Sequence, residues 1–282
     1  MPKGGNELTM TGFGKNDGSL DWSKPSAKQV SFKIKNKNFN AYGPDESITI
    51  AAKDVLLNRE YEYLPRFELE NFGGVVLDAG ANTGLFSLVA SNFARKVVAI
   101  EPHPTNLAFL KRNLAINNVD NVFVVNRSLW SNKSTLNLYQ DNSIAHSLVQ
   151  KTDSFIQTET TTLDEQLDVW GDVDLLKLDV EGAEFAIFDH AKSRQLRQIG
   201  ALVCEIHLTH GGLDPILRKL QDAGFATEHY FPPMRRGDFG YRIDVRGLRK
   251  LKLWRSIAYR LALMIGRKET NLCMVFGLRT NK

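Results

Sequence analysis

The stretch Val75-Val76-Leu77-Asp78-Ala79-Gly80-Ala81-Asn82-Thr83-Gly84 decides the fold of this chain. Its first three residues form a continuous apolar run, which is typical of a strand buried on both faces of a parallel sheet. Gly80 and Gly84 lack a Cβ atom, so the backbone can turn sharply there and approach a ligand. The pattern predicts a strand at 75–80, a tight turn and a helix at 84–94. Asp78 would stand at the carboxyl end of the strand, where open α/β sheets bind ligands.

A second apolar run, Val97 to Ile100, follows about twenty residues later and ends in Glu101. An acidic residue at this place can accept hydrogen bonds from both hydroxyls of a ribose. Parallel strands end at the same edge of a sheet, so we expect Asp78 and Glu101 to face one nucleoside. The two motifs together predict an enzyme with a nucleotide-type cofactor.

The glycine spacing separates two classes of cofactor. A dinucleotide site requires G-x-G-x-x-G and a helix amino end that is open to a pyrophosphate. This turn lacks the middle glycine, and its Asp78 would repel a phosphate. S-adenosylmethionine has no phosphate and carries a sulfonium and an ammonium group, so the acidic turn favours that cofactor. An NAD-linked oxidoreductase is the alternative.

The chain resembles the FkbM family of S-adenosylmethionine-dependent methyltransferases over roughly residues 45 to 230. The matching residues are Asp78-Ala79-Gly80-Ala81-Asn82-Thr83-Gly84, Glu101-Pro102, Thr162-Leu163-Asp164, Lys177-Leu178-Asp179-Val180-Glu181-Gly182-Ala183-Glu184 and Glu205-Ile206-His207. The resemblance implies a class I methyltransferase fold, an α/β Rossmann-like mixed seven-stranded sheet with helices on both faces. It also implies methyl transfer to a hydroxyl oxygen of a sugar, glycan, glycolipid or natural product. The acceptor itself does not follow from the resemblance.

With this cofactor, one set of residues is predicted to hold it at the ends of the first two strands. The set is Asp78, Gly80, Ala81, Asn82, Gly84, Glu101 and Pro102, with Ser128 near the adenine.

Length and composition predict one α/β domain with extensions. With 282 residues, 43% of them apolar, the chain can bury a large core. We divide it into a disordered start (1–29), an accessory segment (30–72) and the methyltransferase domain (73–282). In the accessory segment we expect a strand from Val30 to Lys35, a turn at 43–45 and a helical stretch at 52–71.

Strands and helices alternate along the domain, as in a parallel sheet. Further strands are expected at 96–101, 122–127, 173–178, 201–206, 225–231 and 273–278, with a helix at 104–117. A polar excursion at 132–161 would lie over the cofactor and bring His146 and Ser147 within reach of it.

Cysteine usage and hydropathy indicate the compartment. Cys204 and Cys273 are far apart in the sequence and suggest neither a disulfide framework nor a metal site. The first residues lack the apolar stretch of a secretory signal, and no run reaches the length of a membrane span. We expect a cytoplasmic protein.

The segment Leu175 to Glu184 brings a second group of acids to the same edge of the sheet. An apolar strand delivers Asp179 and Glu181 to its carboxyl end, and Gly182 lets the chain turn into the next helix. Either carboxylate could position an acceptor hydroxyl, remove its proton, hold a divalent ion such as Mg²⁺, or cap the helix. Glu184 falls in the first helical turn, where an acid supports the helix dipole.

His207 ends the next strand two residues after Glu205, so both side chains point to one side of the sheet. Imidazole titrates near neutral pH, which makes His207 the candidate base for deprotonating a hydroxyl. The alternative is a core histidine satisfied by a backbone carbonyl. We assign Asp179, Glu181 and His207 to acceptor positioning and proton removal.

A local excess of positive charge lies between Arg235 and Lys268, with eleven Lys or Arg against two acids in a chain of net charge +4. Apolar residues recur there at helical spacing, which predicts a basic amphipathic insertion before the last strand. Such a helix suits an anionic membrane surface, a lid or a dimer contact. Arg235-Arg236 suits an acidic or phosphorylated acceptor.

Two further alternatives concern this basic segment. No stacking platform or nucleic-acid fold accompanies the charge, so a nucleic-acid partner is the weaker interpretation. A catalytically silent protein of the same fold could instead dock on the inner face of a membrane through residues 235–268.

Overall fold

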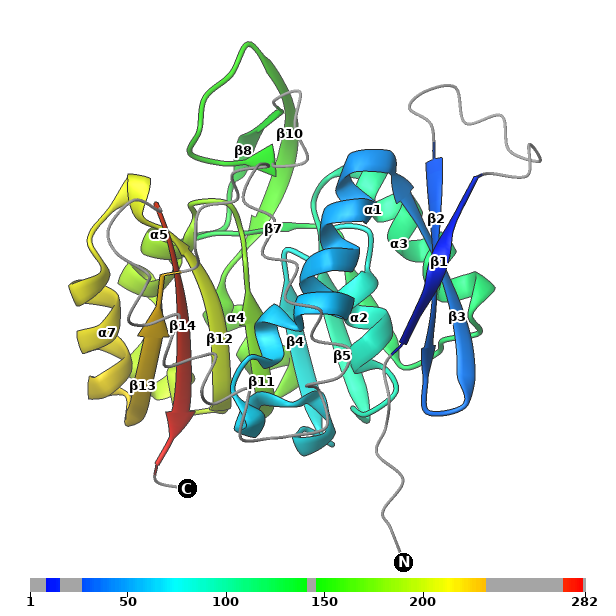
Figure 1. The fold of residues 1–282 in the computed structure, drawn as a ribbon. Coiled ribbons are helices and arrows are strands. Elements are labelled where there is room, and N and C mark those ends of the chain that lie inside the picture. Colours follow the sequence, from blue (N-terminus) through cyan, green and yellow to red (C-terminus); the bar gives the residue numbers. More distant parts are fainter. Residues whose placement is uncertain (1–8, 16–26, 141–145, 232–270, 281–282) are drawn as a thin grey trace, which may run out of the picture.

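The computed structural model describes residues 9–15, 27–140, 146–231 and 271–280. Its centre is a seven-stranded sheet with the order β13-β14-β12-β11-β4-β5-β6 (Figure 1). The strands are β4 (Val75–Ala79), β5 (Lys96–Ile100), β6 (Val122–Val125), β11 (Val173–Leu178), β12 (Ile199–His207), β13 (Phe225–Tyr230) and β14 (Leu272–Arg279). Only β14 runs antiparallel to its neighbours, β12 and β13, among the pairs of this described sheet. The mixed seven-stranded sheet expected from the sequence is therefore confirmed.

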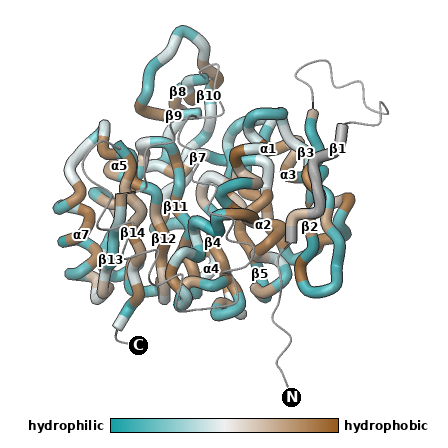
Figure 2. Tube along the Cα trace, viewed as in Figure 1, coloured by the Kyte–Doolittle hydropathy of each residue, from teal (hydrophilic) through white to brown (hydrophobic). Residues whose placement is uncertain are grey.

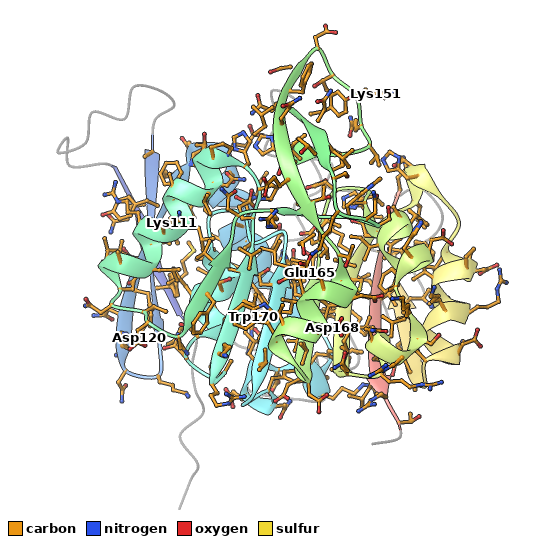
Figure 3. All side chains as sticks on the ribbon, turned by 180° about the vertical axis from the view of Figure 1, so that it is seen from behind. Lys111, Asp120, Lys151, Glu165, Asp168 and Trp170 are labelled. Atoms are coloured by element: carbon orange, nitrogen blue, oxygen red, sulfur yellow. The ribbon has the colours of Figure 1, made fainter. Side chains whose placement is uncertain are left out.

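Helices cover both faces of the sheet because its strands are apolar on both sides. Successive side chains alternate between the faces, so Val76 packs into one core and Leu77 into the other. The first core lies under α1 (Asp45–Ala51), α2 (Leu85–Ala90) and α3 (Pro104–Ile116). The second lies under α4 (Leu163–Trp170), α5 (Glu184–His190), α6 (Ser193–Leu196) and α7 (Leu213–Asp222). Figure 3 shows α4 from behind, with Glu165, Asp168 and Trp170.

Helix α2 is shorter than the predicted helix at 84–94 and is buried along its whole length. Figure 2 shows it in hydrophobic colours. Burial on all sides is typical of a helix enclosed by other elements, and here the accessory segment encloses α2 from outside the sheet. The helix following the glycine turn is thus held rigidly between two layers.

The accessory segment begins with a three-stranded antiparallel sheet of β1 (Thr9–Lys15), β2 (Ala27–Ile34) and β3 (Lys37–Pro44). Asparagine side chains of α3 and of the residue that follows it cover the outer edge of β3. Asn113 and Asn117 each accept a backbone N–H and donate to a backbone carbonyl, at Tyr42 and Asn40 respectively. An edge strand is otherwise a row of unpaired backbone groups. These four bonds fix the small sheet onto the main domain.

The structure corrects three expectations about the first 71 residues. Residues 1–29 include β1 and the start of β2, so this region is not wholly without structure. The predicted turn at 43–45 is the end of β3 and the start of α1. The predicted helical stretch at 52–71 begins earlier, at Asp45, and breaks at Arg59, whose φ of 50° is left-handed. It comprises a π-helical turn η1 (Ala52–Asn58) and three 3₁₀ turns, η2 (Glu60–Glu62), η3 (Pro65–Phe67) and η4 (Leu69–Asn71).

The polar excursion forms a four-stranded sheet of β7 (Ser128–Leu129), β8 (Thr135–Gln140), β9 (His146–Ser147) and β10 (Ser154–Thr161). We call residues 135–140 and 146–161 the flap. It projects beyond the carboxyl ends of the main strands (Figure 1), with Lys151 near its far end (Figure 3).

The remaining expectations concern the cysteines, membrane spans and the basic segment. Cys204 and Cys273, the only cysteines of the sequence, are both free and buried. Within the described ranges, every helix is too short or too polar to cross a bilayer. The basic segment 235–268 lies outside the described residues.

The turn after β4 generates a stability prediction. Gly80 has a φ of 79°, and a Cβ atom there would lie 1.8 Å from the carbonyl oxygen of Asp179. We expect Gly80→Ala to lower the free energy of unfolding by about 3 kcal/mol or more in urea denaturation. Gly224→Ala is the matched control, because Gly224 is also left-handed but a Cβ atom there would meet open space; it should cost about 1–2 kcal/mol. Equal costs for the two variants would contradict the prediction.

Candidate active site

A cleft of about 170 Å³ opens at the carboxyl ends of the parallel strands. Strand alternation explains its composition. Val76, Val97 and Leu175 belong to the core beneath the accessory segment, and residues two or four positions further along each strand point to the same face. That face therefore carries Asp78, Glu101, Lys177 and Asp179 at its edge, and Glu205 joins them from β12, where Val203 belongs to the same core.

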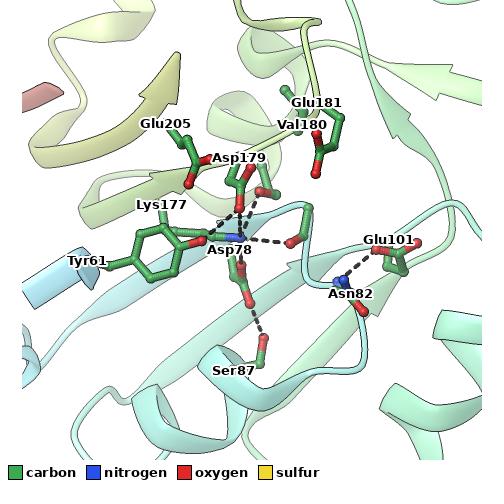
Figure 4. Close-up of polar contacts among 12 residues, drawn as sticks. Tyr61, Asp78, Asn82, Ser87, Glu101, Lys177, Asp179, Val180, Glu181 and Glu205 are labelled. Carbon is green, nitrogen blue, oxygen red and sulfur yellow. Dashed lines mark hydrogen bonds and ion pairs between the residues drawn. The ribbon is translucent and has the colours of Figure 1, made fainter. Parts of the chain in front are cut away.

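A buried lysine holds this edge together. Parallel pairing places Lys177 directly opposite Asp78. Lys177 Nζ lies 3.3 Å from Asp78 Oδ1 and 3.7 Å from Asp179 Oδ2, and it donates a 2.7 Å hydrogen bond to the Gly80 carbonyl (Figure 4). Burial would lower the pKa of Lys177, but Asp78 and Asp179 outweigh it, so the pKa is raised. The ammonium cation thus ties the glycine turn to both acids.

Asp78 occupies a different place from the one expected. Its side chain is 0% exposed, it is absent from the cleft wall, and its Oδ2 accepts a 2.6 Å hydrogen bond from Ser87. In this structure the Asp78 side chain lies beneath the cleft, and its contact with a nucleoside stays a prediction. Asp78 instead anchors Lys177, and through it the turn, from beneath.

Glu101 lies in the cleft wall as predicted, with its orientation fixed by the backbone. Its Oε2 accepts from the Asn82 N–H and its Oε1 from the His103 N–H, both at 2.8 Å. Burial raises the pKa of Glu101 to about 7, although both backbone hydrogen bonds act in the opposite direction. Asn82 itself has a left-handed φ of 51°, and its Oδ1 accepts from Ser47 Oγ at 3.0 Å.

The other predicted cofactor residues divide into two groups. Gly80, Ala81, Asn82, Pro102 and Ser128 line the cleft together with Glu101. Gly84 does not; its φ is 84°, and a Cβ atom there would lie 2.3 Å from a Leu110 methyl group. Gly84 therefore serves the packing of α2 against α3.

Asp179 lies in the wall and binds a residue that the sequence did not single out. Tyr61 Oη donates a 2.7 Å hydrogen bond to Asp179 Oδ2. Burial and the nearby Asp179 raise the pKa of Tyr61 well above its usual range, so the phenol keeps its proton. Tyr61 lies 118 positions away in the chain and has no motif around it, so only the fold reveals the pair.

His207 forms a bridge between two carboxylates. Its Nε2 lies 3.0 Å from Glu181 Oε2, and its Nδ1 lies 3.0 Å from Glu184 Oε1. Burial would lower the pKa of His207, but the hydrogen bonds to Glu181 and Glu184 raise it to about 11. An imidazolium with both N–H groups engaged has no lone pair for a proton. The geometry does not support His207 as a base, nor as a core histidine bonded to a carbonyl.

Glu184 organises the loop before α5. Its side chain is 0% exposed, and its Oε1 accepts from the backbone N–H groups of Val180 and Gly182, each at 3.2 Å. Helix α5 has no side-chain hydrogen bond from its N-cap residue. The predicted capping by Asp179 or Glu181 is therefore not seen, and Glu184 fixes the loop instead.

A metal site with His207 as a ligand does not fit this arrangement of side chains. One ligand atom each of Asp179, Glu205 and His207 lies within 4.8 Å of the others. However, a histidine ligand must offer a free nitrogen lone pair, and both nitrogens of His207 face carboxylates. Lys177 and His207 supply the positive charge at this edge.

The flap and the accessory segment close the cleft from two sides. Ser147 Oγ donates to the Glu181 carbonyl at 2.6 Å, and the His146 ring stacks on His103 with 3.7 Å between centroids. His146 lines the cleft, as the sequence suggested it could, whereas Ser147 fastens the flap. From the opposite side, the accessory segment contributes Ser47, Ile50, Ala51, Asp54, Val55 and Tyr61.

A family model described as the methyltransferase FkbM domain matches residues 78–227, more than half of the chain. Among solved structures, a precorrin-6y C5,15-methyltransferase from Geobacter metallireducens GS-15 shares 17% identity, with 73% of this chain and 80% of that chain covered at a TM-score of 0.37. An rRNA methylase from Streptococcus thermophilus shares 10% identity, with coverages of 80% and 96% and a TM-score of 0.41. A candidate methyltransferase from Streptococcus mutans in complex with SAH shares 9% identity, with coverages of 79% and 97% and a TM-score of 0.38. No curated protein matches the sequence significantly.

The buried lysine generates the prediction of this subsection. Lys177→Met should lower the free energy of unfolding by about 3–5 kcal/mol, because it leaves Asp78 charged, buried and unpaired. Adding Asp78→Asn should recover part of that loss. Urea denaturation of both variants measures the free energy of unfolding. Lys28→Met is the control, because Lys28 pairs with Asp45 at the surface, and this substitution should cost at most about 1 kcal/mol. A Lys177→Met cost as small as that of the control would refute the role given to Lys177.

Proposed function

Because the chain belongs to the FkbM methyltransferase family, we propose that it transfers a methyl group from S-adenosylmethionine to a hydroxyl oxygen. The acceptor class is a sugar, glycan, glycolipid or natural product. When bound, S-adenosylmethionine supplies an electrophilic methyl group on a positively charged sulfur. The remaining chemistry, which is binding, alignment and removal of the hydroxyl proton, belongs to residues of this chain.

The position of Glu101 is the observation that carries the proposal. Its carboxylate lies in the cleft wall, at the end of β5, and two backbone N–H groups hold it in place. A carboxylate fixed in this way can accept hydrogen bonds from the two hydroxyls of a ribose. Next to it, Leu129, Leu138 and Pro102 offer an apolar surface for an adenine, and Ser128 and Asn106 offer polar groups.

The charge of the cleft wall supports a cationic cofactor. The wall carries the carboxylates of Asp54, Glu101, Asp179, Glu181 and Glu205. Lys177, the lysine among the described residues of this wall, is already paired with Asp78. A sulfonium in the cleft would stabilise the ionised forms of these acids, whereas a pyrophosphate would be repelled by them, which disfavours the NAD-linked alternative. For the same reason the wall favours neutral or positively charged acceptors over phosphorylated ones.

Partners beyond the acceptor stay predictions. A peripheral contact with an anionic membrane, or with a second subunit, was expected through residues 235–268, which lie outside the described part of the chain.

Calorimetric titration tests the cofactor. We expect S-adenosylhomocysteine to bind and NAD not to bind, and we expect Glu101→Gln to weaken S-adenosylhomocysteine by about 10- to 100-fold through loss of hydrogen bonds to a charged group. Glu70→Gln, at an exposed position, is the control and should bind like the wild type. Transfer of a labelled methyl group to a panel of methyl glycosides then tests the acceptor class. Failure of the wild type to bind S-adenosylhomocysteine would overturn the proposed function.

The pKa of Glu101 predicts how binding depends on pH. With a pKa of about 7, the carboxylate is largely protonated at pH 6 and largely ionised at pH 8. If only the ionised form accepts both ribose hydroxyls, the dissociation constant for S-adenosylhomocysteine should rise about tenfold from pH 8 to pH 6. The same titration with Glu101→Gln should show a much flatter profile. An equally steep profile in that variant would assign the pH dependence to another group.

A further inference from the structure

Three carboxylates stand at the carboxyl ends of β11 and β12, where an acceptor hydroxyl would meet the methyl group. Two of them already have partners. Asp179 Oδ2 accepts from Tyr61 and lies 3.7 Å from Lys177, and Glu181 Oε2 faces His207 at 3.0 Å. The third, Glu205, has no hydrogen-bond donor among the described residues, and the nearest cationic atom that the structure places near it is His207 Nε2 at 4.0 Å.

Glu205 also has the right position. Cys204 pairs with Leu178 across the parallel strands, so the next residues, Glu205 and Asp179, stand level with each other. Figure 4 draws the Glu205 carboxylate beside Asp179, with no contact drawn to it. The side chain is only 12% exposed and lines the cleft. It is therefore a largely dry carboxylate directed at the space that a ligand would fill.

We propose that Glu205 is the base that removes the proton from the acceptor hydroxyl. The inference rests on the proposed methyl transfer and names a residue for its proton step. It replaces His207, which the sequence favoured, because His207 is a cation held between Glu181 and Glu184.

The surroundings of Glu205 favour proton uptake. The titratable and charged groups around it are Glu60 and Tyr61 from the accessory segment, Lys177, Asp179 and Glu181 from β11 and its loop, Tyr230 from β13, and His207 from its own strand. Burial raises the pKa of Glu205 well above its usual range, Asp179 and Glu60 raise it further, and His207 opposes them. A sulfonium entering the cleft would stabilise the ionised form. Glu205 would thus become a base when the cofactor binds.

The reaction balances with these groups alone. A lone pair of the acceptor oxygen forms the bond to the methyl carbon, while the carbon–sulfur bond breaks and leaves its electrons on sulfur as a neutral thioether. The hydroxyl proton passes to the Glu205 carboxylate, which becomes a neutral carboxylic acid. Glu205 later returns this proton to solvent at the cleft mouth.

The first test requires no acceptor. Binding of S-adenosylmethionine and of S-adenosylhomocysteine to the full chain is measured at pH 7 by calorimetry in two buffers of different ionisation enthalpy. Binding of the cationic S-adenosylmethionine should release more protons from the protein than binding of the uncharged thioether S-adenosylhomocysteine. The difference should be up to about one proton per site. Glu205→Gln should abolish this difference while it keeps the S-adenosylhomocysteine affinity within about threefold, and Glu70→Gln should preserve both. An unchanged difference in Glu205→Gln would overturn the proposal.

The second test measures turnover on methyl α-D-mannopyranoside and methyl α-L-rhamnopyranoside. Glu205→Gln should lower kcat by about 10²- to 10⁴-fold and remove the rise of kcat with pH, whereas full turnover would overturn the proposal. Glu205→Asp keeps a carboxylate and should therefore retain the proton release. It is the variant to measure if Glu205→Gln does not fold. If the wild type binds S-adenosylmethionine but methylates neither glycoside, the proposed acceptor class fails and the proton release still decides on Glu205. If the wild type binds neither S-adenosylmethionine nor S-adenosylhomocysteine, both the proposed function and the role of Glu205 are overturned.

Discussion

The arrangement of the site depends on one cation buried in the sheet. Lys177 stands between Asp78 and Asp179, and its third contact is the carbonyl of Gly80. An ammonium group removed from water is stable only when charges and acceptors surround it. The sheet register supplies Asp78, the end of β11 supplies Asp179, and the turn after β4 supplies the carbonyl. The same interaction therefore sets the shape of the turn, the separation of the two strand ends and the orientation of the acid in the cleft.

The central sheet and the location of the site could be predicted from sequence because both depend on local patterns. Apolar runs of strand length, glycine turns and acids at strand ends mark β4, β5 and β11. What the sequence did not reveal depends on long-range packing. Asn113 and Asn117 cover the edge of β3 from 71 and 77 positions away. Tyr61 reaches Asp179 from a segment without a motif. Asp78 lies in the expected strand, but its side chain pairs with Lys177 beneath the cleft and does not line it.

Ionisation is the second property that local sequence cannot specify. A histidine two residues from a glutamate suggests a neutral base, and that inference depends on the intrinsic pKa of imidazole. The fold places Glu181 and Glu184 on the two nitrogens of His207 and so stabilises the cation. The environment of Glu205 instead favours the neutral form, because burial and neighbouring acids raise its pKa. The fold thus raises the pKa values of two residues of one strand well above those usual for their side-chain types.

The accessory segment adds a practical consequence. The family match begins at Asp78 and ends at 227, but Ser47, Asp54 and Tyr61 form one side of the cleft, and β14 (Leu272–Arg279) lies inside the sheet. A protein trimmed to the matched region would keep the glycine turn and lose that side of the cleft as well as an internal strand. Exchange of residues 45–62 between relatives would alter the cleft wall while the strand ends stay unchanged. The side of the cleft that Ser47, Asp54 and Tyr61 form therefore lies outside the segment that the family match covers.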